Sequence, residues 1–82
     1  MSGTVKVRKY LHTAKRFGEV ISEQRLSLCI TVEQLAQTTN TPVALIRDAE
    51  AGCLHLDLSQ AECILDTLGI QPVVLPAELA TH

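Results

Sequence analysis

The sequence predicts a mainly α domain of four to five helices with a short β-strand at each end. Apolar residues recur every three or four positions from Leu11 to Leu68, which is the spacing of helices that bury one face. Thr4–Tyr10 instead alternates β-branched and basic residues with a period of two, as a half-buried strand does. A second apolar run, Ile70–Leu75, contains one proline and precedes another, which favours an edge strand.

The chain is long enough for one small domain. Of its 82 residues 46% are hydrophobic, and Tyr10 and Phe17 are the only aromatic residues, so we expect an aliphatic core. A domain of this size buries only about 60–65% of its unfolded surface, so dimerisation would stabilise it considerably. No apolar run approaches the roughly 18 residues of a membrane span, and the first ten residues lack the apolar segment of a secretory signal. We therefore expect a cytoplasmic protein without membrane contacts.

The first helix is expected over Thr13–Leu28 and the second from Thr31 to about Thr38. Thr31 and Gln34 have the spacing of a capping box, in which each side chain bonds the backbone N–H of the other residue. Asn40 tolerates the left-handed conformation and can end the second helix. The predicted inner face of the first helix consists of Leu11, Ala14, Phe17, Ile21, Gln24 and Leu28.

A third helix is expected directly after the second. Thr41 offers a hydroxyl for the N-cap, and Pro42 suits the first helical position because its missing N–H has no partner there in any case. This helix would run to Ala51, and Gly52 would end it.

The fourth helix is predicted over Leu58–Leu68. Either Asp57 or Ser59 can cap its start, and Gly69 can close its end. Its predicted inward residues are Ala61, Ile64, Leu65 and Leu68.

The two terminal strands cannot form a stable sheet alone, so they must pair with each other or with the strands of a second subunit. We divide the chain into a basic N-terminal arm and strand (1–12), a helical domain (13–70), and a C-terminal strand and tail (71–82).

Positive and negative charges are separated along the chain. Residues 1–18 carry five cations and no acid, whereas residues 19–82 carry two cations and nine acids, for a net charge of −2. The basic segment can meet a polyanion or an acidic partner, or it can be a solvated face that protects a strand edge. Its cations are Lys6, Arg8, Lys9, Lys15 and Arg16.

The cysteine and histidine residues do not indicate a metal site, a cofactor or an enzyme. Cys29, Cys53 and Cys63 are odd in number and irregularly spaced, so we expect free thiols that are buried or half-buried. No second ligand pair accompanies Cys53 and His55 at a zinc-like spacing. No nucleophile stands beside an evident base, and the chain has no glycine-rich phosphate loop.

The segment from Phe17 to Ile70 resembles the lambda-repressor-like (Xre) helix-turn-helix family. This resemblance implies a helical bundle whose third helix enters the major groove of DNA. It further implies a packed elbow of Leu35, Ala36 and Ile46. The matching residues are Gly18, Ile21, Arg25, Ile30, Thr31, Glu33, Leu35, Ala36, Ile46, Glu50, Gly52, Leu58, Leu68 and Gly69.

Two further features follow from the resemblance. Arg25 and Glu50 match a partly buried ion pair that ties the first helix to the third. The strand after Gly69 is similar to that of HipB-like antitoxins, in which it pairs across a dimer. The residues of this dimer strand would be Gln71, Val73, Val74 and Leu75.

The predicted recognition helix departs from the family in its polar residues. Val43, Ala44 and Asp48 occupy the positions that face bases, where arginine, lysine, asparagine or glutamine would bond base edges. Thr41 and Arg47, together with His55 in the following turn, remain as polar candidates. In addition, Val32 replaces a phosphate-binding glutamine. Cys29 replaces a helix-ending glycine, at a cost of about 1 kcal/mol if the left-handed geometry is kept.

Two hypotheses therefore remain open. The first is a dimeric, antitoxin-like transcriptional regulator that binds operator DNA weakly or with help from a toxin or another regulator. The alternative is a protein-interaction module on the same fold that has lost DNA binding. The candidate DNA contacts are Thr41, Val43, Ala44, Arg47, Asp48, Lys6, Arg8, Lys15 and Arg16.

Overall fold

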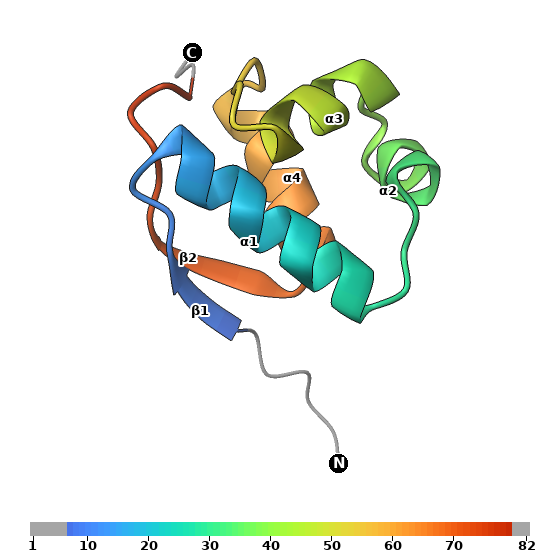
Figure 1. The fold of residues 1–82 in the computed structure, drawn as a ribbon, viewed down its shortest axis with the longest axis horizontal. Coiled ribbons are helices and arrows are strands. Elements are labelled where there is room, and N and C mark those ends of the chain that lie inside the picture. The colour runs from blue at the N-terminus through green and yellow to red at the C-terminus, as the bar shows by residue number, and fades with distance from the viewer. Residues whose placement is uncertain (1–6, 80–82) are drawn as a thin grey trace.

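The computed structural model describes residues 7–79 and is mainly helical (Figure 1). Four helices and a two-stranded parallel sheet make up this part of the chain, so the predicted fold class is confirmed at this level and no fifth helix occurs between residues 7 and 79. No helix in the described range combines the length and apolar character needed to cross a membrane. The elements are β1 (Val7–Tyr10), α1 (Ala14–Ser27), α2 (Val32–Thr39), α3 (Val43–Glu50), α4 (Leu58–Thr67) and β2 (Ile70–Val74).

Side-chain caps fix the starts of three helices. The predicted capping box of α2 is confirmed: the Thr31 hydroxyl accepts from the Gln34 N–H at 3.0 Å, and the Gln34 side chain accepts from the Thr31 N–H at 2.8 Å. Asp57, one of two predicted caps, forms an equivalent box with Gln60 at the start of α4. Thr13 caps α1. These short-range bonds explain why the helices begin where the sequence predicts.

The start of α3 differs from the prediction. Pro42, not Thr41, occupies the N-cap, and this proline makes no side-chain cap hydrogen bond. The Thr41 N–H donates to the Ala36 carbonyl at 2.9 Å, so Thr41 belongs to the turn that ends α2. Its hydroxyl donates to the Thr39 carbonyl at 3.3 Å, and the residue is only 4% exposed. The prediction was wrong because the end of α2 uses the residue that was assigned to the start of α3.

The core lies where the four helices meet, and it contains the predicted elbow of Leu35, Ala36 and Ile46. All four predicted inward residues of α4 are buried. Leu28 is an exception on α1, with 47% of its surface exposed. The helix ends at Ser27 and Leu28 is its C-cap, so Leu28 no longer follows the packed face.

Helices α1 and α3 cross closely at Gly18. A Cβ atom at this position would overlap the Ala49 carbonyl oxygen and lie 3.1 Å from that of Glu50. At the other end of α1, the Gln24 side-chain amide donates to the Leu68 carbonyl at 3.0 Å and ties α1 to the end of α4. Together these contacts fix α3 and α4 against α1.

The sheet pairs β1 with β2 of the same chain, in parallel, with Val7 opposite Ile70. The sequence left open whether the strands pair within one chain, and the resemblance implied that the C-terminal strand pairs across a dimer. In the structure one edge of β2 is occupied by β1, and pairing across a dimer stays a prediction. The strand ends at Val74, so Leu75 of the predicted dimer strand lies outside it, and positions 4–6 of the predicted N-terminal strand lie outside the described residues.

Candidate nucleic-acid and protein interface

Helices α2 and α3 form the candidate surface, and a short turn joins them. Asn40 adopts a left-handed φ of 54°, as predicted, and lets the chain reverse direction there. An open groove of about 560 Å³ lies between the two helices. It is lined by Glu33, Ala36, Gln37, Asn40, Thr41, Pro42 and Val43.

The predicted DNA contacts on this surface differ in exposure. Thr41 is buried, so its hydroxyl is not presented to a ligand, and Val43 is half-buried against the core. Ala44, Arg47 and Asp48 are exposed along α3. An approaching molecule would therefore meet one methyl group, one cation and one carboxylate on this helix.

Arg47 is bound by Glu33 across the turn. Its Nη2 atom donates to Oε2 of Glu33 at 2.8 Å, and 61% and 65% of the two side chains are exposed. The pKa of Glu33 lies below its ordinary value, first because its carboxylate accepts a hydrogen bond from its own backbone N–H and also because Arg47 attracts the charged form. Asp48, the exposed residue that follows Arg47, brings the sum of these three charges to −1.

The sequence does not reveal the pairing of Glu33 with Arg47. The two residues are 14 positions apart and lie on different helices, so no helical spacing relates them. Glu33 also has a local place in the first turn of α2, where a carboxylate is favourable. The pair depends on how the turn at Asn40 orients the two helices.

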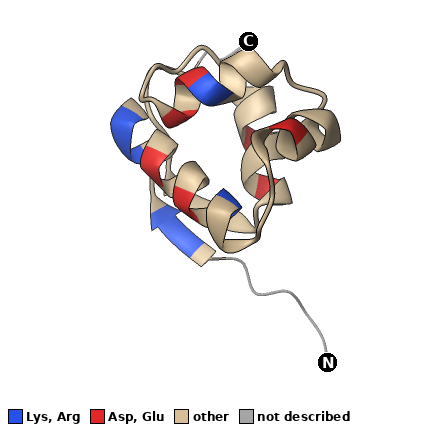
Figure 2. Ribbon diagram, turned by 45° about the vertical axis from the view of Figure 1, so that its right-hand side comes forward, with Lys and Arg blue, Asp and Glu red and all other residues tan. Residues whose placement is uncertain are grey.

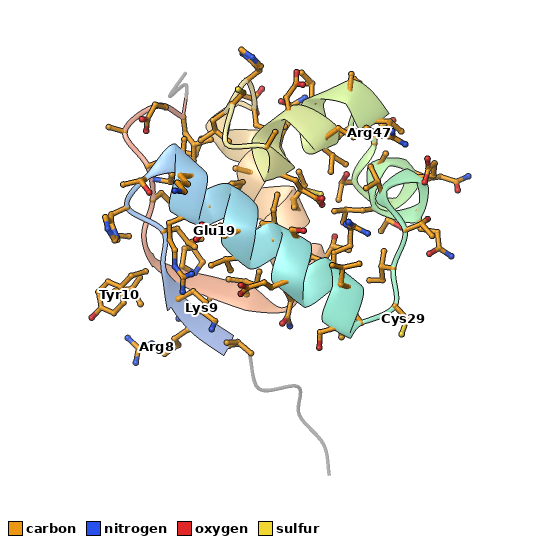
Figure 3. The ribbon with its side chains drawn as sticks, viewed as in Figure 1. Arg8, Lys9, Tyr10, Glu19, Cys29 and Arg47 are labelled. Atoms are coloured by element: carbon orange, nitrogen blue, oxygen red, sulfur yellow. The ribbon has the colours of Figure 1, made fainter. Side chains whose placement is uncertain are left out.

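The predicted basic contacts lie elsewhere on the molecule. Arg8 is on β1, Lys15 and Arg16 are in the first turn of α1, and Lys6 lies outside the described residues. Figure 2 shows Lys and Arg residues on β1 and at the start of α1, and Figure 3 places Arg8 on the side away from Arg47. The structure thus divides the candidate DNA contacts between two separate surfaces.

The predicted ion pair between Arg25 and Glu50 is confirmed. Nε and Nη2 of Arg25 donate to the two carboxylate oxygens at 2.7 and 3.1 Å, while Nη1 donates to the Ile30 carbonyl at 2.9 Å. Only 12% and 14% of the two side chains are exposed. The hydrogen bond to Glu50 raises the pKa of Arg25 above its ordinary value. Arg25 joins α1 to the end of α3 and is not available to a ligand.

The cysteines are free, as predicted, but all three are exposed instead of buried. Cys29 stands at the turn after α1 with a left-handed φ of 58°, Cys53 follows α3, and Cys63 lies on the outer side of α4. These positions leave the packed faces, which the sequence spacing did not reveal. Within residues 7–79 no three His, Cys, Asp or Glu side chains gather as metal ligands.

Comparisons of the chain with models of protein families, with curated proteins and with solved structures gave no match.

Proposed function

We propose that the chain is a lambda-repressor-like helix-turn-helix domain whose α2–α3 surface binds a protein partner. We define this surface by Glu33, Gln37, Ala44, Arg47 and Asp48, around the groove between the helices. The short turn between α2 and α3, the buried elbow and the fork of Arg25 on Glu50 support the fold assignment.

The pairing of Arg47 with Glu33 carries the functional proposal. DNA binding depends on cations that neutralise phosphates, and base recognition depends on free donors and acceptors. On the α2–α3 surface the one cation is already bound at 2.8 Å, and Asp48 adds an unfavourable charge toward phosphate. A groove of mixed apolar and polar residues, beside charges that sum to −1, instead suits a protein partner better than a phosphate.

A second candidate function is DNA binding by a dimeric, antitoxin-like regulator in the cytoplasm. It is favoured by the cations of β1 and the first turn of α1, namely Arg8, Lys9, Lys15 and Arg16. Such contacts would hold phosphates without selecting a sequence, and a homodimer would double them. A toxin or another regulator would then supply the remaining affinity.

Fluorescence anisotropy distinguishes the two functions. A labelled duplex from upstream of the gene and a scrambled duplex are titrated with the protein at about 50 mM and about 200 mM salt. The protein-interaction proposal expects equal, weak binding to both duplexes that disappears at the higher salt. Preferential binding to the upstream duplex at the higher salt would overturn it in favour of the regulator.

Site-specific photocrosslinking tests the partner surface directly. A photoreactive amino acid at Ala44 should trap a discrete protein in the source cells, whereas the same group at exposed Ala77 should not. With that protein purified, Ala44→Glu should weaken the complex at least tenfold, because a buried unpaired charge is costly at an interface. Ala77→Glu is the matched control and should bind as the wild type does. Equal affinity of both variants would exclude the α2–α3 surface.

A further inference from the structure

Within residues 7–79, strand β1 has one partner strand and no buried residue. Val7, Arg8 and Tyr10 are exposed and Lys9 is half-buried; Tyr10 retains 65% of its surface. The body of the domain therefore covers little of this strand, and Figure 3 shows Arg8 and Tyr10 pointing away from it. A two-stranded sheet is marginal in water, and a further strand would stabilise it.

The hydrogen bonds identify which edge of the sheet is free. The Val7 N–H donates to the Gly69 carbonyl at 2.9 Å, and the Leu11 N–H donates to that of Val74 at 3.1 Å. Because alternate residues of a strand bond to the same neighbour, the N–H and C=O groups of Arg8 and Tyr10 are directed to the outer edge. These groups have the geometry to pair with an added strand.

The opposite edge of the sheet is not equivalent. By the same alternation, Ile70 and Pro72 direct their backbone groups to the outer edge of β2. Pro72 has no N–H to donate, so it interrupts any new ladder there. A third strand can therefore add with regular hydrogen bonds only beside β1.

We propose that the outer edge of β1 is a docking site for an extended, acidic segment of a partner protein, which adds to the sheet as a third strand. Arg8 and Lys9 supply the charge complementarity, and no ion pair engages either of them within residues 7–79. Exposed apolar side chains on both strands supply the remaining contact. They are Val7, Tyr10, Val73 and Val74.

The charges of β1 argue against a second copy of the chain as the occupant. In an antiparallel pairing of two β1 strands whose twofold axis passes the middle of the strand, Arg8 or Lys9 lies opposite its own symmetry mate. Like charges directly opposite each other destabilise a strand pair. The exposed valines argue against nucleic acid, because phosphates offer no apolar contact. In an acidic segment with alternating apolar residues, the carboxylates can pair with the cations and the apolar side chains can contact the valines.

The test uses the ¹⁵N-labelled full chain and capped eight-residue peptides. The main probe alternates Glu and Val, a second probe alternates Lys and Val, and a third replaces the two central Val residues of the first by Pro. The Glu–Val peptide should shift the amide signals of Arg8 and Tyr10 and slow their exchange with solvent. The other two should bind at least fivefold more weakly, for lack of charge complementarity or of backbone donors.

Variants locate the site. Arg8→Gln with Lys9→Gln should weaken binding of the Glu–Val peptide roughly fivefold, whereas Lys15→Gln with Arg16→Gln removes the same charge from the first turn of α1, outside the strand edge, and should have a clearly smaller effect. Tyr10→Pro removes an outward N–H group that Tyr10→Ala keeps. Adding the Glu–Val peptide should therefore slow the amide exchange of Arg8 in the alanine variant but not in the proline variant. Circular dichroism verifies that each variant is folded.

Three results would overturn the proposal. The first is equal binding of the Glu–Val and Lys–Val peptides. The second is a set of shifted amides that lies on α2 and α3, which would leave the α2–α3 surface as the docking site. The third is a duplex, or a concentration-dependent dimer, that shifts the β1 amides at lower concentration than the peptide does.

Discussion

Replacing Gly18 by alanine tests how closely α1 and α3 approach each other. In an exposed helical position this change is favourable by about 1 kcal/mol, because alanine has the higher helix propensity. At Gly18 the added methyl group would overlap the Ala49 carbonyl oxygen and press on that of Glu50 at 3.1 Å. Both atoms belong to the backbone of α3, so a rotamer change cannot relieve the overlap and the helices must separate.

The size of the effect follows from that separation. Overpacking a tight contact costs about 1–3 kcal/mol, and moving α3 also strains the fork of Arg25 on Glu50. We expect a net loss near 2 kcal/mol, out of a total of roughly 4–12 kcal/mol for a chain of this length. For a small domain this corresponds to a fall in Tm of roughly 10 °C.

The assay is urea unfolding followed by far-ultraviolet circular dichroism, because the chain has no tryptophan and its one tyrosine is exposed. Glu23, exposed on α1, gives the matched control: Glu23→Ala should be more stable than Glu23→Gly. At position 18 the order should be reversed, with glycine the more stable. An alanine variant that equals or exceeds the wild type in stability, with an unchanged m-value, would refute the close crossing.

Three other stability changes follow from the contacts described. Arg25→Lys keeps the charge but loses the fork to Glu50, so urea titration should show a loss of about 2 kcal/mol. Cys29→Gly relieves a left-handed φ and should raise the free energy of unfolding by up to about 1 kcal/mol in the same assay, whereas Asn40→Gly should change it less. The lowered pKa of Glu33 means that its charge stabilises the fold above pH 4.5 and that this contribution is lost as the pH falls through the folded-state pKa. The wild type should therefore be more stable than Glu33→Gln at pH 7, and the difference should shrink as the pH falls below 4.5; a difference that stays constant with pH would contradict the assignment.

The sequence predicts the helices well because their signals are local. Thr31 and Asp57 each cap a helix by bonding to a residue only three positions further along the chain. Asn40 needs no distant contact to adopt its left-handed conformation. The pairing of β1 with β2 joins residues about 60 positions apart, so no local pattern could select it over pairing with another subunit.

The candidate site was predicted less completely than the fold. Arg47 was assigned correctly to the exposed face of α3, but its neutralisation by Glu33 depends on the orientation of two helices. Thr41 was proposed as a DNA contact from the family resemblance, whereas the turn after α2 uses its backbone and buries its side chain. Both features depend on the geometry of the turn between α2 and α3, which the local sequence pattern does not give.

The parallel pairing of the first strand with the last also determines how the domain opens. Strand β1 has no buried residue, whereas β2 contributes Ile70 to the core that α1–α4 share, so β1 can detach from β2 without unfolding the helices. Amide hydrogens of β1 should therefore exchange with solvent through local opening, at a lower free energy than those of α1. A ligand that binds the paired sheet raises this opening energy by RT ln(1 + [L]/Kd). The protection of the β1 amides against exchange therefore measures the fraction of protein that has ligand bound at the sheet, while exchange in the helices stays unchanged.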